Sequence, residues 1–216
     1  MSTAVTQAPL QQLHSLTDIL RPDVNVVSVP RRLEPSLEAK LTKLAQCSSF
    51  SHSATLEATS PDVGPLLASI AEGPVRDFLA EEIRFLAGQL GAVLAQQHLG
   101  ARLYVTRSDG CRKIHADNVT IRLLCTYAGP GTEWLSEDDL VRSSLRPSQR
   151  DAESHNRAVI RKGGALRRCA PGEVLLLKGH TFPGNAGRGA AHRSPPLGSS
   201  GVARLVLKID EGRCGC

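Results

Sequence analysis

The sequence is poor in aromatic residues and has no C-x-x-C pair, no long apolar run and no leader pattern. It has one Trp, two Tyr and four Phe in 216 residues, and no basic stripe is interleaved with them. This argues against a nucleic-acid surface built on base stacking. No apolar run approaches the ~18 residues of a membrane-spanning helix. The N-terminal stretch has neither a basic n-region nor an apolar h-region, so we expect a cytoplasmic protein without a membrane partner.

The six cysteines also lack the spacing of an ordinary zinc knuckle. In a chain of this size without a leader, we expect reduced thiols rather than a disulfide framework. Cys214 and Cys216 are separated by one residue, whereas paired zinc cysteines usually have about two to four residues between them. We therefore assign both to a tail, residues 211–216.

The sequence does contain enough apolar material for one core. It is 41% hydrophobic and 22% charged, which is typical of globular proteins, and its length is short for two domains. The net charge of +5 is uneven, because residues 1–100 carry 7 Lys and Arg against 10 Asp and Glu, whereas residues 101–216 carry 19 against 11. The basic half favours a small anionic ligand over nucleic acid.

The first hundred residues have mainly helical patterns. Residues 1–20 are polar, show little periodicity and are expected to be weakly ordered, and residues 21–99 are predicted to be a mainly helical support region. Within it, a short β-branched run at 25–29 ends at a proline, as an edge strand does. Leucines at helical spacing predict a helix over 36–44.

The strongest helical rhythm begins at residue 60. Its apolar residues recur every three or four positions as far as His98, with a break at Gly73-Pro74. We expect Gly100 to close this helix, because glycine is the usual residue just beyond a helix end.

Beyond Gly100 the pattern changes to that of strands. Short apolar runs separated by Gly and Pro turns predict strands at 102–106, 119–127, 173–178 and 204–209. Many short strands of this kind favour a sandwich or jelly roll. We therefore predict an α+β fold in which residues 100–210 form a β core and the 61–98 helices pack on its outer face.

A basic, polar insertion interrupts this core at residues 136–170. Its eight cationic residues are Arg142, Arg146, Arg150, Arg157, Arg161, Lys162, Arg167 and Arg168. Long connections of this kind are often functional lids or mobile segments. We expect this one to be mobile without substrate and to shield the site when it is occupied.

The candidate metal ligands are His115, Asp117 and the distal His192. At strand spacing, residues i and i+2 point to the same face, so the first two can reach one ion. Two imidazoles and a carboxylate suit Fe(II), Mn(II) or Zn(II), and a facial set of three leaves positions open for oxygen chemistry at Fe(II). An H-x-D triplet also occurs by chance, and a lone histidine is more often a surface or core residue, so the residues alone leave that alternative open.

The order of these motifs resembles that of the 2-oxoglutarate/Fe(II)-dependent dioxygenases of the prolyl-hydroxylase type. The H-x-D triplet precedes a strand that ends at Tyr127, and a Pro171-Gly172-Glu173 turn leads into the strand before His192. Arg204 begins the last strand. The resemblance covers roughly residues 100–210.

This resemblance implies a double-stranded β-helix, a jelly-roll or cupin-like core, that binds Fe(II) and 2-oxoglutarate. His115, Asp117 and His192 would be the catalytic metal ligands. Arg204 would bind the distal carboxylate of 2-oxoglutarate, and Tyr127 is a candidate second contact to it. Candidate pocket walls are Trp134 and Phe182.

More narrowly, the segments CTYAGPGTEWL, EVLLLKGHTFPGN and AHRSPP resemble an uncharacterised bacterial family often encoded beside zinc-homeostasis GTPases. The expected function is an Fe(II)- and 2-oxoglutarate-dependent oxygenase of the hydroxylase type, whose prime substrate the sequence does not identify. Two alternatives stay open. One is a non-catalytic or hydrolytic Zn(II)-binding protein of metal homeostasis, and the other is a cupin-like binding module in which Arg204 merely begins a strand.

Overall fold

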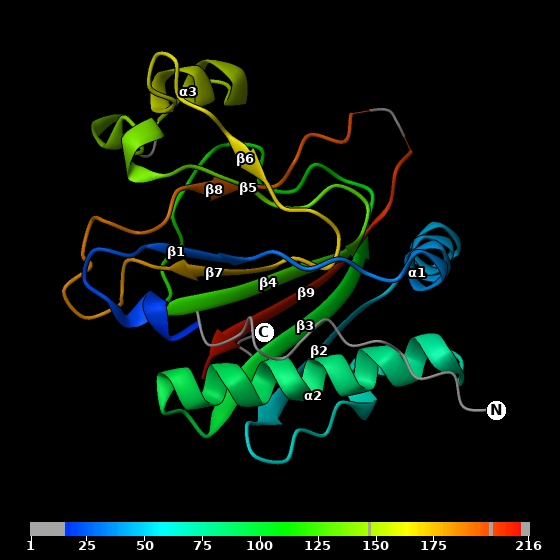
Figure 1. Ribbon diagram of the computed structural model, residues 1–216. Coiled ribbons are helices and arrows are strands. Elements are labelled where there is room, and N and C mark those ends of the chain that lie inside the picture. The colour runs from blue at the N-terminus through cyan, green and yellow to red at the C-terminus, as the bar shows by residue number, and fades with distance from the viewer. Residues whose placement is uncertain (1–15, 147, 199–200, 213–216) are drawn as a thin grey trace.

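Two antiparallel sheets dominate the computed structural model of the protein, which describes residues 16–146, 148–198 and 201–212. The larger sheet contains, in spatial order, β1 (Val26–Val29), β7 (Val174–Lys178), β4 (Ile121–Ala128), β9 (Arg204–Glu211), β3 (His98–Thr106) and β2 (Ser51–Glu57) (Figure 1). The smaller sheet contains β6 (Arg167–Arg168), β5 (Glu133–Trp134) and β8 (His192–Arg193). The four strands predicted beyond Gly100 are confirmed as β3, β4, β7 and β9, and β1 is an edge strand as predicted.

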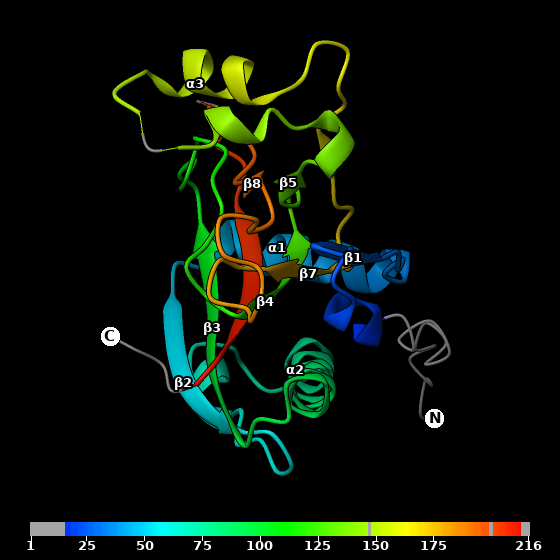
Figure 2. The ribbon, with the colours of Figure 1, turned by 90° about the vertical axis from the view of Figure 1, so that its left-hand side faces the viewer.

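The helices lie on both sides of the larger sheet. They are α1 (Pro35–Cys47), α2 (Pro74–Leu94) and the short α3 (Ala152–Val159), with 3-10 turns η2 (Gly64–Leu67), η3 (Glu137–Asp139) and η4 (Arg142–Ser144). Figure 2 shows the larger sheet between α2 on one side and the smaller sheet with α3 on the other. None of the helices in the described part of the chain has the length and apolar character needed to cross a membrane.

The central strands are apolar on both faces because both faces are covered. All five residues of β7 are buried. On one face, Leu123, Leu176 and Leu207 share a core with Leu79 and Ile83 of α2. On the other face, a second apolar cluster joins Leu124, Leu175 and Val206 to Cys169, Ala190 and Trp134. Alternate residues of one strand thus serve two different layers.

The α1 helix begins as predicted, whereas α2 ends earlier than predicted. Pro35 begins α1, and the carboxylate of Glu34 accepts a hydrogen bond from the backbone N–H of Leu37 at 3.1 Å. The α2 helix ends at Leu94, and Ala95 follows it with a left-handed φ of 51°. The predicted extension to His98 and closure at Gly100 are wrong, because the left-handed residue is an alanine, which carries no stop signal.

The region 21–99 contains α1 and α2 and also supplies the predicted β1 and the unpredicted β2, the two edge strands of the larger sheet. The β2 strand was missed because most of its residues are exposed or half-buried, so it has little apolar alternation. The helices α1 and α2 and the larger sheet share one continuous core.

The fold is mixed α and β with antiparallel sheets and few helices. Within the described ranges the two sheets stay separate and no closed barrel forms. The reason is the length of β5, β6 and β8, which have two residues each. Strands this short cannot extend the hydrogen bonding from one sheet to the other.

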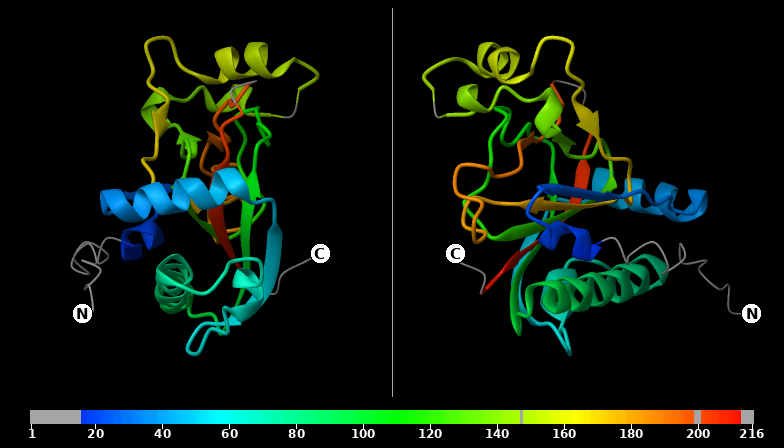
Figure 3. Two further views of the ribbon diagram at one scale, coloured as in Figure 1. Left: turned by 90° about the vertical axis from the view of Figure 1, so that its right-hand side faces the viewer. Right: turned by 60° about the vertical axis from the view of Figure 1, so that its left-hand side comes forward.

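The basic insertion 136–170 has more structure than its sequence indicated. It contains η3, η4, α3 and β6, and it packs through an apolar cluster that includes Leu140 and Val159 with Ile114 and Ala191. Figure 3 shows this segment at the end of the molecule opposite α2. Its predicted action as a lid stays a prediction.

Candidate metal centre

The side chains of His115, Asp117 and His192 converge on one point. Their potential ligand atoms all lie within 4.8 Å of one another. The Nε2 atom of His192 lies 3.1 Å from Asp117 Oδ2, and the Nε2 atom of His115 lies 3.4 Å from Asp117 Oδ1. The structure therefore brings together the three ligands proposed from the sequence, although they are far apart along the chain.

Backbone pairing places the two histidines side by side. His115 and His192 form an isolated antiparallel bridge in which each backbone N–H donates to the other carbonyl at 2.9 Å. His192 also pairs with Trp134 in the smaller sheet. Because directly opposite residues of an antiparallel pair share a face, the two imidazoles meet, with ring centroids 4.6 Å apart.

Each imidazole is oriented by its own backbone. The Nδ1 atom of His115 lies 2.9 Å from the carbonyl oxygen of Lys113, and Nδ1 of His192 lies 3.1 Å from that of Ala190. A carbonyl only accepts hydrogen bonds, so each Nδ1 donates its proton there, and each Nε2 points to Asp117, to which it donates when it is protonated. Such second contacts are typical of metal-binding histidines. A cation bound between these three side chains would take the place of the Nε2 protons and leave each Nε2 lone pair to the metal.

The electrostatics keep Asp117 ionised. Burial alone would raise the pKa of its carboxyl group, but hydrogen bonds with His115 and His192 and the charge of Arg122 hold that pKa well below its usual range. Burial lowers the pKa of His115, but the hydrogen bonds with Asp117 and the Lys113 carbonyl outweigh it and raise the pKa. At neutral pH the carboxylate is therefore in its metal-binding form.

Arg122 is a neighbour of the site that the sequence analysis missed. Its Nη1 donates to Asp117 Oδ2, and its Nε and Nη2 donate to Asp210 Oδ1 and Oδ2 at 2.6 and 2.8 Å. Arg122 and Asp210 are cross-strand partners in β4 and β9. Lys208 Nζ lies 3.3 Å from Asp210 Oδ2. This contact depends on strand order, for which the sequence carries no signal.

The insertion supports the segment that leads into His115. The side chain of Asn156 accepts a hydrogen bond from the Ile114 N–H at 2.7 Å and donates to the Arg112 carbonyl at 2.9 Å. The neighbouring His155 places Nε2 at 2.9 Å from the Ile114 carbonyl. Both side chains are buried. They satisfy the backbone groups that a neighbouring strand would otherwise satisfy.

Arg204 is a buried cation at the start of β9, with only 3% of its surface exposed. Its Nε donates to the Pro130 carbonyl at 2.7 Å, and its Nη2 lies 3.3 Å from Thr126 Oγ1. No carboxylate forms an ion pair with it in the described part of the chain. Burial lowers its pKa, and Tyr104 and Glu133 partly offset that effect. A buried cation without a paired anion is costly.

The structure does not bring Tyr127, the predicted second contact to the carboxylate, together with Arg204. The Tyr127 ring packs edge-on against Phe78 of α2, with centroids 6.1 Å apart, and belongs to the helix-side core. Thr126 meets Arg204 instead, because successive residues of a strand point to opposite faces. Tyr104 of β3 lies on the Arg204 side, where burial raises the pKa of its hydroxyl and the charge of Arg204 partly offsets the rise.

The two candidate pocket walls lie in different layers. Trp134 packs against the cluster between the two sheets, whereas Phe182 packs against the helix-side core, with Lys178 Nζ 4.4 Å from its ring centroid. Phe182 is therefore not a wall of the space beside Arg204. Asn185 and His180 hold the loop before His192, since Asn185 donates to the Gly179 carbonyl and His180 Nδ1 accepts from the Gly189 N–H.

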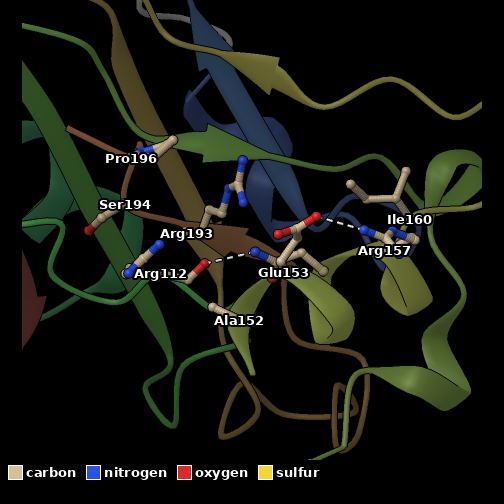
Figure 4. A pocket seen from close by; sticks show the side chains of 9 residues that line it. Arg112, Ala152, Glu153, Arg157, Ile160, Arg193, Ser194 and Pro196 are labelled. Atoms are coloured by element: carbon tan, nitrogen blue, oxygen red, sulfur yellow. Dashed lines mark hydrogen bonds and ion pairs between the residues drawn. The ribbon is translucent and has the colours of Figure 1, made fainter. Parts of the chain in front are cut away.

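A cavity of about 410 Å³ lies beside α3, but it is separate from the three converging side chains. Figure 4 shows Arg112, Glu153, Arg157 and Arg193 around it, and none of its nine lining residues is His115, Asp117 or His192. Each of its three arginines forms an ion pair with a carboxylate of the protein. We therefore assign no ligand to this cavity.

Comparison with solved structures finds several oxygenases of similar length. The dioxygenase for auxin oxidation 1 of Arabidopsis thaliana, in a binary complex with 2-oxoglutarate, is 10% identical with a TM-score of 0.49, over 92% of this chain and 86% of that one. The rice dioxygenase for auxin oxidation is 16% identical with a TM-score of 0.44, over 93% and 77%. A prolyl-4-hydroxylase of Pseudomonas putida is 13% identical with a TM-score of 0.45, over 94% and 100%.

Comparison with curated protein sequences gives no significant match. A family model does match, over residues 11–210, and its description is a protein of unknown function. The match includes the three converging side chains, Arg122 and Arg204. The chain belongs to this family, DUF1826.

Proposed function

We propose that the protein is an Fe(II)- and 2-oxoglutarate-dependent oxygenase of the hydroxylase type. The observation that carries this proposal is the convergence of two Nε2 atoms and one carboxylate, with both Nδ1 atoms bonded to backbone carbonyls. His115, Asp117 and His192 would hold the metal as a facial set of three donors. A set of three leaves room for a chelating co-substrate and for dioxygen.

Arg204 supports 2-oxoglutarate as the co-substrate. It is buried without a paired anion among the described residues, and its guanidinium offers a planar fork to a carboxylate. We propose that it binds the carboxylate of 2-oxoglutarate that is remote from the metal. The hydroxyl groups of Thr126 and Tyr104, on the same face, would complete this subsite in place of Tyr127.

The fold is consistent with this assignment. We propose that the two sheets are the two halves of a double-stranded β-helix, with the cluster of Leu124, Leu175 and Val206 filling the space between them. His192 comes from the smaller sheet and Arg204 from the larger. The co-substrate would then lie between the sheets.

The residues of the chain have distinct roles in this mechanism. When bound, iron supplies the redox chemistry between dioxygen and the 2-oxo acid. Arg204 binds and orients the co-substrate, and the apolar cluster between the sheets excludes water from it. Asp117 stays deprotonated because its pKa is lowered, so it needs no proton transfer before it binds the metal.

Anaerobic titration of the purified protein with Fe(II) and then with 2-oxoglutarate tests the proposal. We expect one Fe(II) per chain, a charge-transfer band on addition of 2-oxoglutarate, and succinate release in air. His115→Ala and Asp117→Ala should lose the metal, because the two protein ligands that remain would not hold it. Full metal stoichiometry in both variants would refute the assignment of the ligands.

Zinc binding is the second candidate, because two histidines and a carboxylate also suit Zn(II) with a bound water. A wild-type protein that binds Zn(II) tightly and shows no band with 2-oxoglutarate would favour this hydrolytic or non-catalytic role in metal homeostasis. Arg204 argues against it, since a zinc site of this kind has no need of a buried, unpaired cation.

A further inference from the structure

We infer that Arg122 is a positioning residue that restricts Asp117 to a single metal-binding oxygen. This inference rests on the proposed metal centre. It states that Arg122 limits the number of protein atoms that bind the metal. Arg122 contacts neither of the histidines through any described hydrogen bond. It acts on the metal only through the carboxylate of Asp117.

The geometry fixes the guanidinium on both sides. One edge of Arg122 is held by two hydrogen bonds to Asp210, at 2.6 and 2.8 Å, and Nη1 then reaches Asp117 Oδ2. The side chains of Arg122, Asp117 and Asp210 are 17%, 15% and 19% exposed. A bidentate guanidinium–carboxylate pair has a defined orientation, so Arg122 cannot turn away from Asp117 without breaking both bonds to Asp210.

This contact decides how Asp117 can bind a metal. A carboxylate can bind a cation through one oxygen or through both. Oδ2 accepts a charge-assisted hydrogen bond from Arg122 and lies 3.1 Å from His192 Nε2, whereas the described contacts of Oδ1 are limited to His115 Nε2 at 3.4 Å. Oδ1 therefore keeps more of its lone-pair capacity for the metal. Without Arg122, Asp117 would be free to bind through both oxygens and would fill a position that the co-substrate requires.

Arg122 should also lower the affinity of the site for a metal, which is unusual for a residue that positions a ligand. A guanidinium near a dication repels it, and its hydrogen bond withdraws charge from the ligand oxygen. Removing Arg122 would also leave Asp210 with only Lys208 as a partner, which makes the surroundings more negative. We therefore expect loss of Arg122 to strengthen metal binding. Loss of an ordinary supporting contact instead weakens it, by about tenfold to a hundredfold.

The test uses Co(II) as the only probe, with the full chain as wild type, Arg122→Met and Arg157→Met. Arg157 is the matched control, because it pairs with Glu153 on an exposed surface at 2.6 Å. Co(II) affinity is measured by calorimetry, and the intensity of its visible absorption is measured because that intensity falls as the coordination number rises.

We expect Arg122→Met to bind Co(II) at least about threefold more tightly, with weaker visible absorption per ion, and Arg157→Met to match the wild type. Arg122→Lys should restore part of the wild-type affinity and spectrum, since a single ammonium cannot hold both carboxylates. If Arg122→Met does not fold, Arg122→Gln keeps hydrogen-bond donors without the charge and serves for the same two measurements.

Weaker Co(II) binding by the folded variant, or an unchanged spectrum, would overturn this inference and leave the proposed function intact. Failure of the wild type to bind Co(II) would overturn the proposed metal centre, and this inference with it. The two failures are therefore distinguishable.

Discussion

Replacement of Arg204 by methionine should weaken the binding of 2-oxoglutarate and leave the free energy of unfolding almost unchanged. Methionine has a similar length and no charge, so it fills the same space between the sheets without a cation. Arg204 is 3% exposed and has no ion-pair partner among the described residues. Replacing a buried ionic group with an apolar residue of similar volume is often neutral or stabilising, whereas the anchor for a carboxylate would be lost.

The expected loss of 2-oxoglutarate affinity follows from the burial of Arg204. Breaking a desolvated ion pair by removing one partner costs about 3–5 kcal/mol, and solvent screening is small at this exposure. At about 1.4 kcal/mol for each tenfold change, 2-oxoglutarate should bind at least about a hundredfold more weakly. In the protein without ligand, the lost bonds to Pro130 and Thr126 are offset by the relieved desolvation of the cation. We expect its free energy of unfolding to change by less than about 1 kcal/mol.

The assay has two parts. Titration with 2-oxoglutarate in the presence of Fe(II) gives the co-substrate affinity, and urea denaturation of the metal-free protein gives the free energy of unfolding. Arg204→Lys should recover part of the affinity, because a point charge replaces only part of the planar fork. Fe(II) stoichiometry should stay unchanged in both variants. Wild-type affinity in Arg204→Met would refute the assignment of this residue to the co-substrate.

Three further predictions concern the metal and the segments around it. Metal affinity should fall as pH drops from about 7 to 5. The pKa of His115 is raised, so protons compete with the metal for its imidazole at a higher pH than for a free imidazole. A metal affinity that does not change with pH would contradict this. Asn156→Ala should lower the free energy of unfolding by about 2–3 kcal/mol, since it leaves the buried Ile114 N–H unpaired, while the exposed Glu153→Ala should not. Limited proteolysis of residues 136–170 should slow when metal and co-substrate are bound, and equal cleavage in both states would argue against a lid.

The strands of the core could be predicted because their physical signal is local. The strands β4 and β7 are buried on both faces, so most of their residues are apolar, and β9 contains the apolar run 205–207; these runs stand out between Gly and Pro turns. The β2 strand lies at an edge and carries no such run. The end of α2 at Ala95 was missed for a similar reason, since tertiary packing imposes the left-handed conformation on an alanine.

The candidate site could be predicted in part. The spacing of His115 and Asp117 is a local pattern, and the resemblance added His192 and Arg204. Tyr127 follows Leu123 and Cys125 on the helix-side face of β4, opposite Thr126, which meets Arg204. The choice between the two faces depends on tertiary packing, which the local sequence does not show.

The contacts around the ligands were not predictable from local patterns. Arg122 meets Asp210, 88 residues away, only because β4 and β9 are neighbours in the sheet. Asn156 meets Ile114 across 42 residues from a helix inside a segment that looked merely polar. Each contact requires the strand order, which composition and spacing do not encode.

The position of β9 in the larger sheet has a consequence for how the protein is made. It is the last strand in chain order, yet it lies between β4 and β3. Until it is inserted, β3 has only β2 beside it, and Arg122 has no Asp210. Contacts over such long sequence separations are entropically costly and slow to form. A chain that has not yet placed β9 therefore exposes unpaired strand edges at β3 and β4.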